Sequence, residues 1–179
     1  MNIMLIGGGG REHAILRSLK KNPAVETVWM LPGNGAMESE AICYPIGATD
    51  LDGIVAFAKE HKVDYAVVAP DDPLVLGCVD RLNELGIPCF GPKANAAIIE
   101  GSKAFSKDLM KKYGIPTAKY EIFTELDKAL EYLKTAPIPT VVKADGLALG
   151  KGVIIAQTYE EAVEAVTDMM ANAKFGKSG

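Results

Sequence analysis

The residues with the clearest chemical pattern lie between positions 140 and 154, where an apolar run delivers Lys143 and a second apolar run follows a glycine-rich turn. The β-branched neighbours predict a strand with half-buried surroundings, so the Lys143 ammonium needs an anionic partner, and a polyphosphate is the most useful one. Turn glycines let the backbone approach the same anion. A hairpin with a solubilising lysine and ordinary turn glycines is the plain alternative. The other residues of the predicted phosphate hairpin are Gly146, Gly150, Lys151 and Gly152.

Three other segments with unusual chemistry follow predicted strands. Residues 7–10 are four glycines before Arg11 and a predicted helix, whose free N–H groups and dipole favour phosphate. Residues 32–35 contain Asn34, and Asp71 begins an acidic pair whose carboxylates can accept hydrogen bonds from sugar hydroxyls. Ligands sit at the carboxyl ends of parallel strands, so together these segments suit a phosphorylated sugar. Tight-turn glycines, an Asx turn and a helix N-cap are the alternatives.

Composition and charge narrow the class of protein. With 179 residues, 49% of them apolar, the chain is expected to form one large or two small globular domains. The net charge of −4 without a basic block argues against nucleic acid as the main partner, although a local basic pocket stays open. Three cysteines without C-x-x-C spacing and only two histidines predict no metal cluster and favour a reducing cytoplasm. No signal peptide or membrane span is expected.

Up to about residue 92, short apolar strands alternate with helices and with Gly/Pro turns. Strands are expected at 2–6, 27–31 and 65–69, with a brief one before residue 92, and helices at 11–20 and 51–62. A further helix is expected to run through Leu85, with Asp72 as its N-cap and Pro73 as its first residue. This rhythm predicts a parallel sheet covered on both faces.

Beyond residue 92 the pattern changes to a linker and a smaller unit. Residues 94–113 read as two helical pieces broken at Gly101, and residues 114–117 as a linker. The smaller unit is expected to contain a strand at 119–123, the lysine hairpin, and helices after the capping patterns that start at Thr124 and Thr158. Residues 174–179 form a glycine-rich loop without a following strand, so the molecule is expected to be cut off there.

Two common nucleotide motifs fail on spacing. The dinucleotide fingerprint G-x-G-x-x-G has Glu12 or His13 where its third glycine belongs, and the second strand supplies no acid for a ribose. A P-loop ending at residues 176–178 has Ala171 in place of its first glycine and follows a helix. A nicotinamide dinucleotide or P-loop site is therefore not predicted.

Taken together, six motifs resemble the phosphoribosylamine–glycine ligase (glycinamide ribonucleotide synthetase) family of the ATP-grasp superfamily. The resemblance covers the whole chain in order and with matching spacing. The motifs lie at residues 6–14, 32–35, 70–74, 100–105, 115–118 and 142–153.

The resemblance implies an α/β fold: a Rossmann-like parallel sheet, the pre-ATP-grasp domain, followed by a linker and a partial ATP-grasp α+β subdomain. The domains are expected at residues 1–100, 101–118 and 119–179. It also implies that ATP phosphorylates glycine to glycyl phosphate, which the amine of 5-phosphoribosylamine attacks to give glycinamide ribonucleotide in purine synthesis.

Carried over by matched motif, the resemblance implies two sets of ligand contacts. Lys103 joins Lys143 and the hairpin residues in binding ATP, which acts with Mg²⁺ or Mn²⁺. The metal ligands are expected beyond Gly179, so this chain alone is expected to be inactive, and no catalytic residue is assigned. The contacts expected for phosphoribosylamine are Gly8, Gly9, Gly10, Arg11, Asn34 and Asp71.

Two positions depart from the family pattern, and two alternative functions remain. Asp71 stands where the family usually has glutamate, which shortens the ribose contact, and Leu149 replaces a smaller residue. A carboxylating or formylating purine enzyme of the same superfamily is one alternative, although residues 100–103 and 32–35 argue against it. The other is a non-catalytic module that senses nucleotides.

Overall fold

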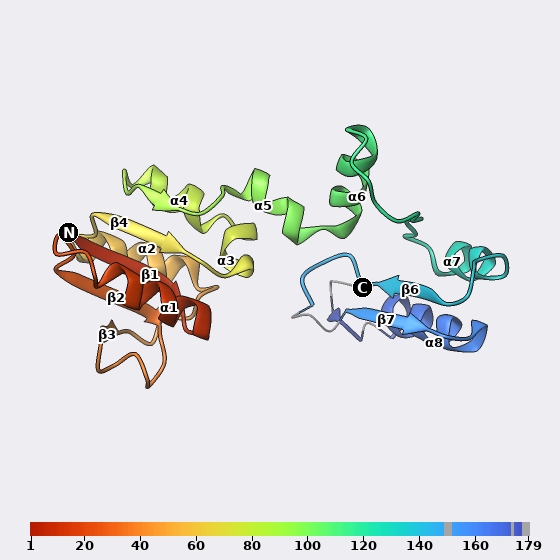
Figure 1. Ribbon diagram of the computed structural model, residues 1–179, viewed down its shortest axis with the longest axis horizontal. Coiled ribbons are helices and arrows are strands. Elements are labelled where there is room, and N and C mark those ends of the chain that lie inside the picture. The colour runs from red at the N-terminus through yellow and green to blue at the C-terminus, as the bar shows by residue number, and fades with distance from the viewer. Residues whose placement is uncertain (149–151, 173, 177–179) are drawn as a thin grey trace. The chain divides into compact units, whose positions relative to one another are not determined.

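The chain folds into two compact units, Met1–Ile98 and Ile99–Gly179. The structure is a computed structural model that describes residues 1–148, 152–172 and 174–176. Each unit combines helices with one sheet (Figure 1). The elements of the first unit are β1 (Asn2–Gly7), α1 (Gly10–Leu19), β2 (Thr27–Pro32), β3 (Ile42–Cys43), α2 (Leu51–Glu60), β4 (Tyr65–Val68), α3 (Asp71–Val75), α4 (Cys78–Glu84) and β5 (Cys89–Phe90).

The first unit is built around a five-stranded parallel sheet in the order β3-β2-β1-β4-β5. The chain moves outward from β1 through β2 to β3 and then returns to the other side of β1 with β4. The strand order therefore reverses between β1 and β4, which is the place where open α/β sheets bind ligands. The parallel sheet that the sequence predicts is confirmed.

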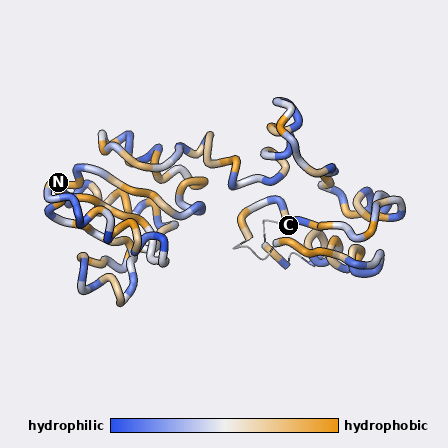
Figure 2. Tube along the Cα trace, viewed as in Figure 1, coloured by the Kyte–Doolittle hydropathy of each residue, from blue (hydrophilic) through white to orange (hydrophobic). Residues whose placement is uncertain are grey.

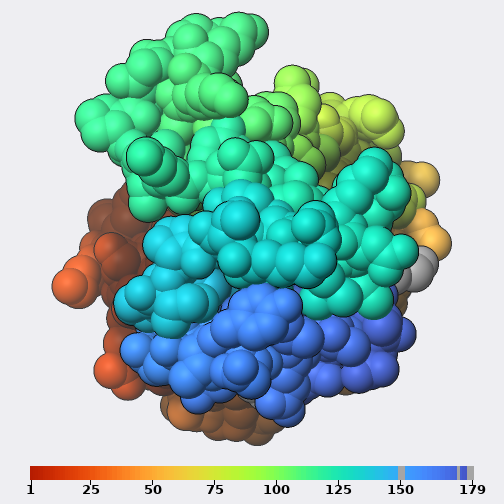
Figure 3. All heavy atoms as spheres, turned by 90° about the vertical axis from the view of Figure 1, so that its right-hand side faces the viewer, coloured from red at the N-terminus to blue at the C-terminus, as the bar shows by residue number. Residues whose placement is uncertain are grey.

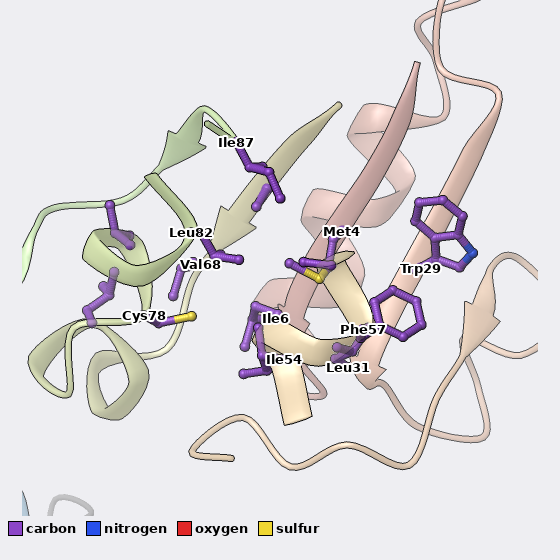
Figure 4. Close-up of a cluster of buried hydrophobic side chains, with 14 of the residues drawn as sticks. Met4, Ile6, Trp29, Leu31, Ile54, Phe57, Val68, Cys78, Leu82 and Ile87 are labelled. Carbon is purple, nitrogen blue, oxygen red and sulfur yellow. The ribbon is translucent and has the colours of Figure 1, made fainter. Parts of the chain in front are cut away.

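Alternate residues of each strand pack into two separate cores, one on each face of the sheet. In β1, Ile3 and Leu5 face the side that holds Leu16 of α1, whereas Met4 and Ile6 face the side covered by α2 and α4. Strands buried on both faces are continuously apolar, and they appear mostly orange in Figure 2. The larger core is drawn in Figure 4 and includes Met4, Ile6, Trp29, Leu31, Ile54, Phe57, Val68, Cys78, Leu82 and Ile87.

Trp29, which belongs to β2, is 9% exposed in this core. Its indole packs edge-on against Phe57, with ring centroids 5.8 Å apart, and against His61 at 5.4 Å. The His61 ring in turn stacks on Phe57. Aromatic edge contacts of this kind are favourable beyond the burial of area.

The helix expected after β4 differs from the prediction in two ways. It begins at Asp71 with Pro70 as its N-cap, so the expectation that Asp72 is the N-cap is wrong. Pro70 has extended backbone angles, and Pro73 fits inside the first turn because an N–H there has no partner within the helix. The helix also stops at Val75, because Gly77 adopts a left-handed φ of 88° before α4 begins. Two short helices replace the single one predicted.

The second unit packs two helices against one face of an antiparallel hairpin. Its small core contains Ala129 and Leu133 of α7 together with Ala156, Ala162 and Val166. The atoms of α7 and α8 adjoin on the surface seen in Figure 3, in teal and blue. The remaining elements are α5 (Ala94–Gly101), α6 (Lys103–Lys112), α7 (Leu126–Leu133), β6 (Thr140–Lys143), β7 (Val153–Ala156) and α8 (Tyr159–Met170).

Helix capping in the second unit agrees with the sequence at α8 but not at α7. Thr158 is the N-cap of α8, and its hydroxyl accepts a hydrogen bond from the Glu161 N–H at 3.2 Å. The expected cap at Thr124 is wrong, because α7 begins one residue later with Glu125 as its N-cap. The break of the preceding helical region near Gly101 is confirmed by the separation of α5 from α6.

The strand expected at residues 119–123 is absent from the described structure. Side chains hold this region instead: Tyr120 Oη donates to Asp108 at 2.8 Å, and Lys107 Nζ donates to Thr117 Oγ1 at 2.6 Å. A strand needs backbone partners on a neighbouring strand, which the apolar pattern of five residues cannot supply by itself.

Candidate functional site

The glycine run after β1 is shaped by close contact with the loop after β2. A Cβ on Gly8 would lie only 2.4 Å from the carbonyl oxygen of Gly33. The Gly33 N–H donates to the Gly7 carbonyl at 3.1 Å, and Gly7 itself has a φ of 121°. Gly7 and Gly8 are therefore required by the protein's own packing.

The amino end of α1 already holds an anionic side chain. Glu12, which is 5% exposed, accepts a hydrogen bond from the Gly9 N–H at 2.6 Å. This bond forms one half of a capping box and places the carboxylate at the positive end of the helix dipole. The Gly9 N–H is thus used within the protein, and a Cβ on Gly10 would meet no atom within 4 Å. The open positions of the loop are Gly10 and the exposed Arg11.

Asn34 joins the loops after β1 and β2. Its side-chain amide donates to the Gly8 carbonyl at 2.7 Å, and its oxygen accepts from the Ala36 N–H at 2.8 Å. The second bond is an Asx turn, the plain alternative that the sequence offered. Both polar groups of the side chain therefore have partners, and a role for Asn34 in binding a ligand remains a prediction.

A cavity of about 380 Å³ opens beside α1 and the carboxyl ends of β4 and β5. Arg11 and Glu12 supply its charged groups, and the rest of its wall is apolar. Phe90 is 64% exposed although it is large and aromatic. Asp71 starts α3 directly after β4 but is not among the residues that line this cavity. The other lining residues are Ile15, Val68, Ala69, Leu74, Gly91 and Pro92.

A polar cluster ties the turn after β2 to α1. Glu40 accepts hydrogen bonds from Arg17 Nη2 and from His13 Nε2, each at 2.9 Å, and Lys20 Nζ donates to the Glu40 carbonyl at 2.6 Å. The hydrogen bond from Arg17, followed by that from His13, lowers the pKa of Glu40 to about 2. The cluster anchors the segment that also contains Asn34. Sequence reasoning missed Glu40, since only the i, i+4 spacing of His13 and Arg17 marks that side of the helix.

In the second unit, one face of the β6–β7 hairpin is open. Val141 pairs with Ile155 and Lys143 pairs with Val153, so these four side chains share one face. All four are exposed, whereas Val142 packs into the core beneath. The argument that burial forces Lys143 to find an anion is therefore wrong. What the structure shows instead is an exposed ammonium beside a row of aliphatic side chains.

Lys103 lies at the start of α6 and is held by the loop that follows β6. Its Nζ donates to the Gly146 carbonyl at 2.9 Å and, more weakly, to the Asp145 carbonyl at 3.4 Å. The Asp145 carboxylate accepts from the Ala104 N–H at 2.6 Å and from the Ser102 hydroxyl at 2.9 Å. The structure thus brings Lys103 and the Gly146 loop together, although they are far apart in sequence.

The glycine turn between the two strands is described only in part. Gly150 and Lys151 lie outside the described residues, as does Leu149. A Cβ on Gly152 would lie 2.7 Å from the Ala148 side chain and 3.1 Å from that of Ala144. Close packing of the turn on itself therefore accounts for Gly152.

The described residues lack two further kinds of functional feature. They contain no group of three or more His, Cys, Asp or Glu side chains arranged to hold a metal ion. In the same part of the chain, no helix is both long and apolar enough to cross a bilayer.

Comparison with known proteins gives consistent matches. A phosphoribosylamine–glycine ligase of Vibrio vulnificus is 50% identical over 181 residues, covering 100% of this chain and 42% of the relative. The crystal structure of phosphoribosylamine–glycine ligase from Thermotoga maritima has a TM-score of 0.78 at 31% identity and covers 98% of this chain and 41% of that one.

A more distant structure shares the fold alone. The biotin carboxylase domain of the 2-oxoglutarate carboxylase from Hydrogenobacter thermophilus, crystallised with MgADP, ADP and bicarbonate, has a TM-score of 0.77 at 21% identity. It covers 99% of this chain and 42% of that chain.

Two family descriptions match along the chain. Residues 1–100 match "Phosphoribosylglycinamide synthetase, N domain", and residues 101–179 match "Phosphoribosylglycinamide synthetase, ATP-grasp (A) domain". The chain spans about 42% of the length of the curated relatives. It belongs to the phosphoribosylglycinamide synthetase family.

Proposed function

We propose that this chain is part of an ATP-dependent ligase that joins glycine to 5-phosphoribosylamine. In the proposed reaction a glycine carboxylate oxygen attacks the γ-phosphorus of ATP, the bond to the β,γ-bridging oxygen breaks, and glycyl phosphate and ADP result. The phosphoribosylamine nitrogen then attacks the glycyl carbonyl and the C–N bond forms. Phosphate leaves with the electron pair of the broken C–O bond, and the nitrogen releases one proton to solvent. Family membership and the names of the similar proteins support this assignment.

The main observation in support of the proposed ATP site is the open face of the β6–β7 hairpin, which bears Lys143. Its ammonium is exposed next to Val153, and Val141 and Ile155 continue the same face. A nucleotide has a flat base with two apolar faces and a polyanionic tail, so it suits aliphatic side chains with a cation among them. Lys103 supplies the second positive charge. The predicted contacts at Gly146, Gly150, Lys151 and Gly152 belong to the same proposal.

For the sugar phosphate, the structure favours a narrower set of contacts than the sequence predicted. Gly10 and Arg11 are the open groups at the positive end of α1, and Arg11 also lines the cavity beside the ends of β4 and β5. Asp71 remains the proposed partner of ribose hydroxyls. Gly8, Gly9 and Asn34 contribute by shaping the loop, because their contacts are made within the protein.

The proposed nucleotide is bound with Mg²⁺ or Mn²⁺, which would neutralise phosphate charge when present. In this proposal Lys103 and Lys143 donate to phosphate oxygens, and as ammonium groups they cannot ligate a metal. No other described residue is proposed as a metal ligand. The three cysteines are free, which supports the proposed reducing, cytoplasmic setting.

Titration of the chain with MgATP, followed by calorimetry, tests the nucleotide site. Lys143→Ala is expected to weaken binding about ten- to a hundredfold, the usual value of a charge-assisted contact. Lys128→Ala, which removes an exposed lysine of α7 paired with Glu125, is the matched control and should bind as the unmodified chain does. Equal affinity of the two variants would refute the assignment of Lys143.

Titration with glycinamide ribonucleotide, followed by amide NMR, tests the sugar-phosphate site. The Gly10 and Arg11 amides are expected to shift, since they are open at the helix end. The Lys143→Ala variant should show the same shifts as the unmodified chain, because the two sites belong to different units. An absence of shifts at millimolar ligand would overturn the proposal for this loop.

A further inference from the structure

Asp145 connects the two elements that present the lysines of the second unit. Its carboxylate accepts from the Ala104 N–H and the Ser102 hydroxyl, both at the start of α6. Its backbone carbonyl accepts from the Lys103 N–H at 3.2 Å. Asp145 follows β6 by two residues, so it links the strand that ends at Lys143 to the helix that begins at Lys103.

The same loop restrains the Lys103 side chain. A lysine ammonium has three donors, and the carbonyls of residues 145 and 146 take up two of them. Both acceptors are neutral, so the ammonium keeps its full charge and one donor for an anion. The four-carbon stem is thereby held in one orientation before a ligand arrives, which reduces the ordering that binding requires.

Capping of α6 alone does not explain these contacts. The N-cap of this helix is Ser102, whose hydroxyl oxygen already accepts from the Phe105 N–H at 3.0 Å. Asp145 adds a bond to the Ala104 N–H from a segment about forty residues away. The additional bond fixes the helix to the hairpin loop, so its effect is on the relative position of the two.

We propose that Asp145 is a positioning residue for the nucleotide phosphates: it fastens the start of α6 to the loop after β6, so that Lys103 is held in place beside that loop. The inference rests on the proposed function and deepens it. Asp145 does not touch the nucleotide in this account. It acts through Lys103. Substitution of Asp145 should therefore weaken MgATP binding only in a chain that still has Lys103.

A double-mutant cycle of MgATP affinity tests this dependence. Asp145→Ala is expected to weaken binding about tenfold or more, and Asp145→Asn less, because an amide oxygen can still accept from the Ala104 N–H. The Asp145→Ala, Lys103→Ala double variant should bind no more weakly than Lys103→Ala alone. Glu131→Ala, which removes an exposed carboxylate paired with Lys134 on α7, is the matched control.

A readout without nucleotide accompanies the cycle. The Ala104 amide should be protected from hydrogen exchange in the unmodified chain and in Asp145→Asn, and should lose protection in Asp145→Ala. Two results would reject the positioning role but leave the proposed function standing. One is that the affinity losses of Asp145→Ala and Lys103→Ala add up in the double variant. The other is that Asp145→Ala binds MgATP as the unmodified chain does while Lys143→Ala binds it weakly. If the unmodified chain binds no MgATP, the proposed function fails and this inference fails with it.

Discussion

The contact between Gly8 and Gly33 leads to a sharp prediction about two neighbouring glycines. In Gly8→Ala the new Cβ would stand 2.4 Å from the Gly33 carbonyl oxygen, whereas ordinary contact begins at 3.4 Å. The loops after β1 and β2 must therefore separate by about 1 Å, as in other overpacked sites. That movement would strain the Gly33–Gly7 and Asn34–Gly8 hydrogen bonds.

The expected cost follows from the size of this overlap. Overpacking usually destabilises by about 1–3 kcal/mol. For a unit the size of Met1–Ile98 this lowers Tm by roughly 5–20 °C. Gly10→Ala is the matched control: its Cβ meets no atom within 4 Å, and alanine favours the helix by up to about 1 kcal/mol.

Thermal unfolding followed by Trp29 fluorescence measures both variants. Gly8→Ala should melt well below the unmodified chain, and Gly10→Ala at or slightly above it. The Gly10→Ala variant should nevertheless bind glycinamide ribonucleotide more weakly, because a ligand that approaches this backbone meets the added methyl group. Equal Tm values for the two variants would show that overlap with the Gly33 carbonyl oxygen is not the reason for a glycine at position 8.

Three further outcomes are expected. The pKa of Glu40 lies below its usual 4.5. Ionised Glu40 should therefore contribute its full stabilisation above about pH 4.5, and this contribution should decrease towards pH 2. Urea titrations in which the unmodified chain shows no such loss of stability relative to Glu40→Gln would contradict this. Amides of β6 and β7 should exchange faster than those of β1, since the hairpin has an open face and β1 is paired on both sides; equal protection would refute it. Gly77→Ala should destabilise by about 1–2 kcal/mol because Gly77 is left-handed, measured by chemical denaturation.

The parallel sheet was predictable because the relevant information is local. Residues 2–6 and 65–69 are short, mainly apolar runs followed by glycine and proline, and runs of this kind can be recognised without knowing their partners. The α8 cap at Thr158 was found for the same reason, since its bond spans three residues. The sequence was therefore sufficient where an element depends only on interactions within itself.

The misses depend on partners or on competing local choices. A strand at 119–123 needs a neighbour that the pattern does not reveal, and the single helix expected through Leu85 was interrupted by the left-handed Gly77. Glu40 meets His13 across 27 positions, and Asp145 meets Ser102 across 43. The exposure of Lys143 was also missed, because β-branched neighbours indicate a strand but do not show which of its faces is covered.

The position of the single tryptophan makes the first unit optically distinct from the second. Indole emission depends on what surrounds the ring, and Trp29 of β2 is buried against the rings of Phe57 and His61. Selective excitation of this ring therefore follows unfolding of residues 1–98, while tyrosine absorbance and circular dichroism register both units.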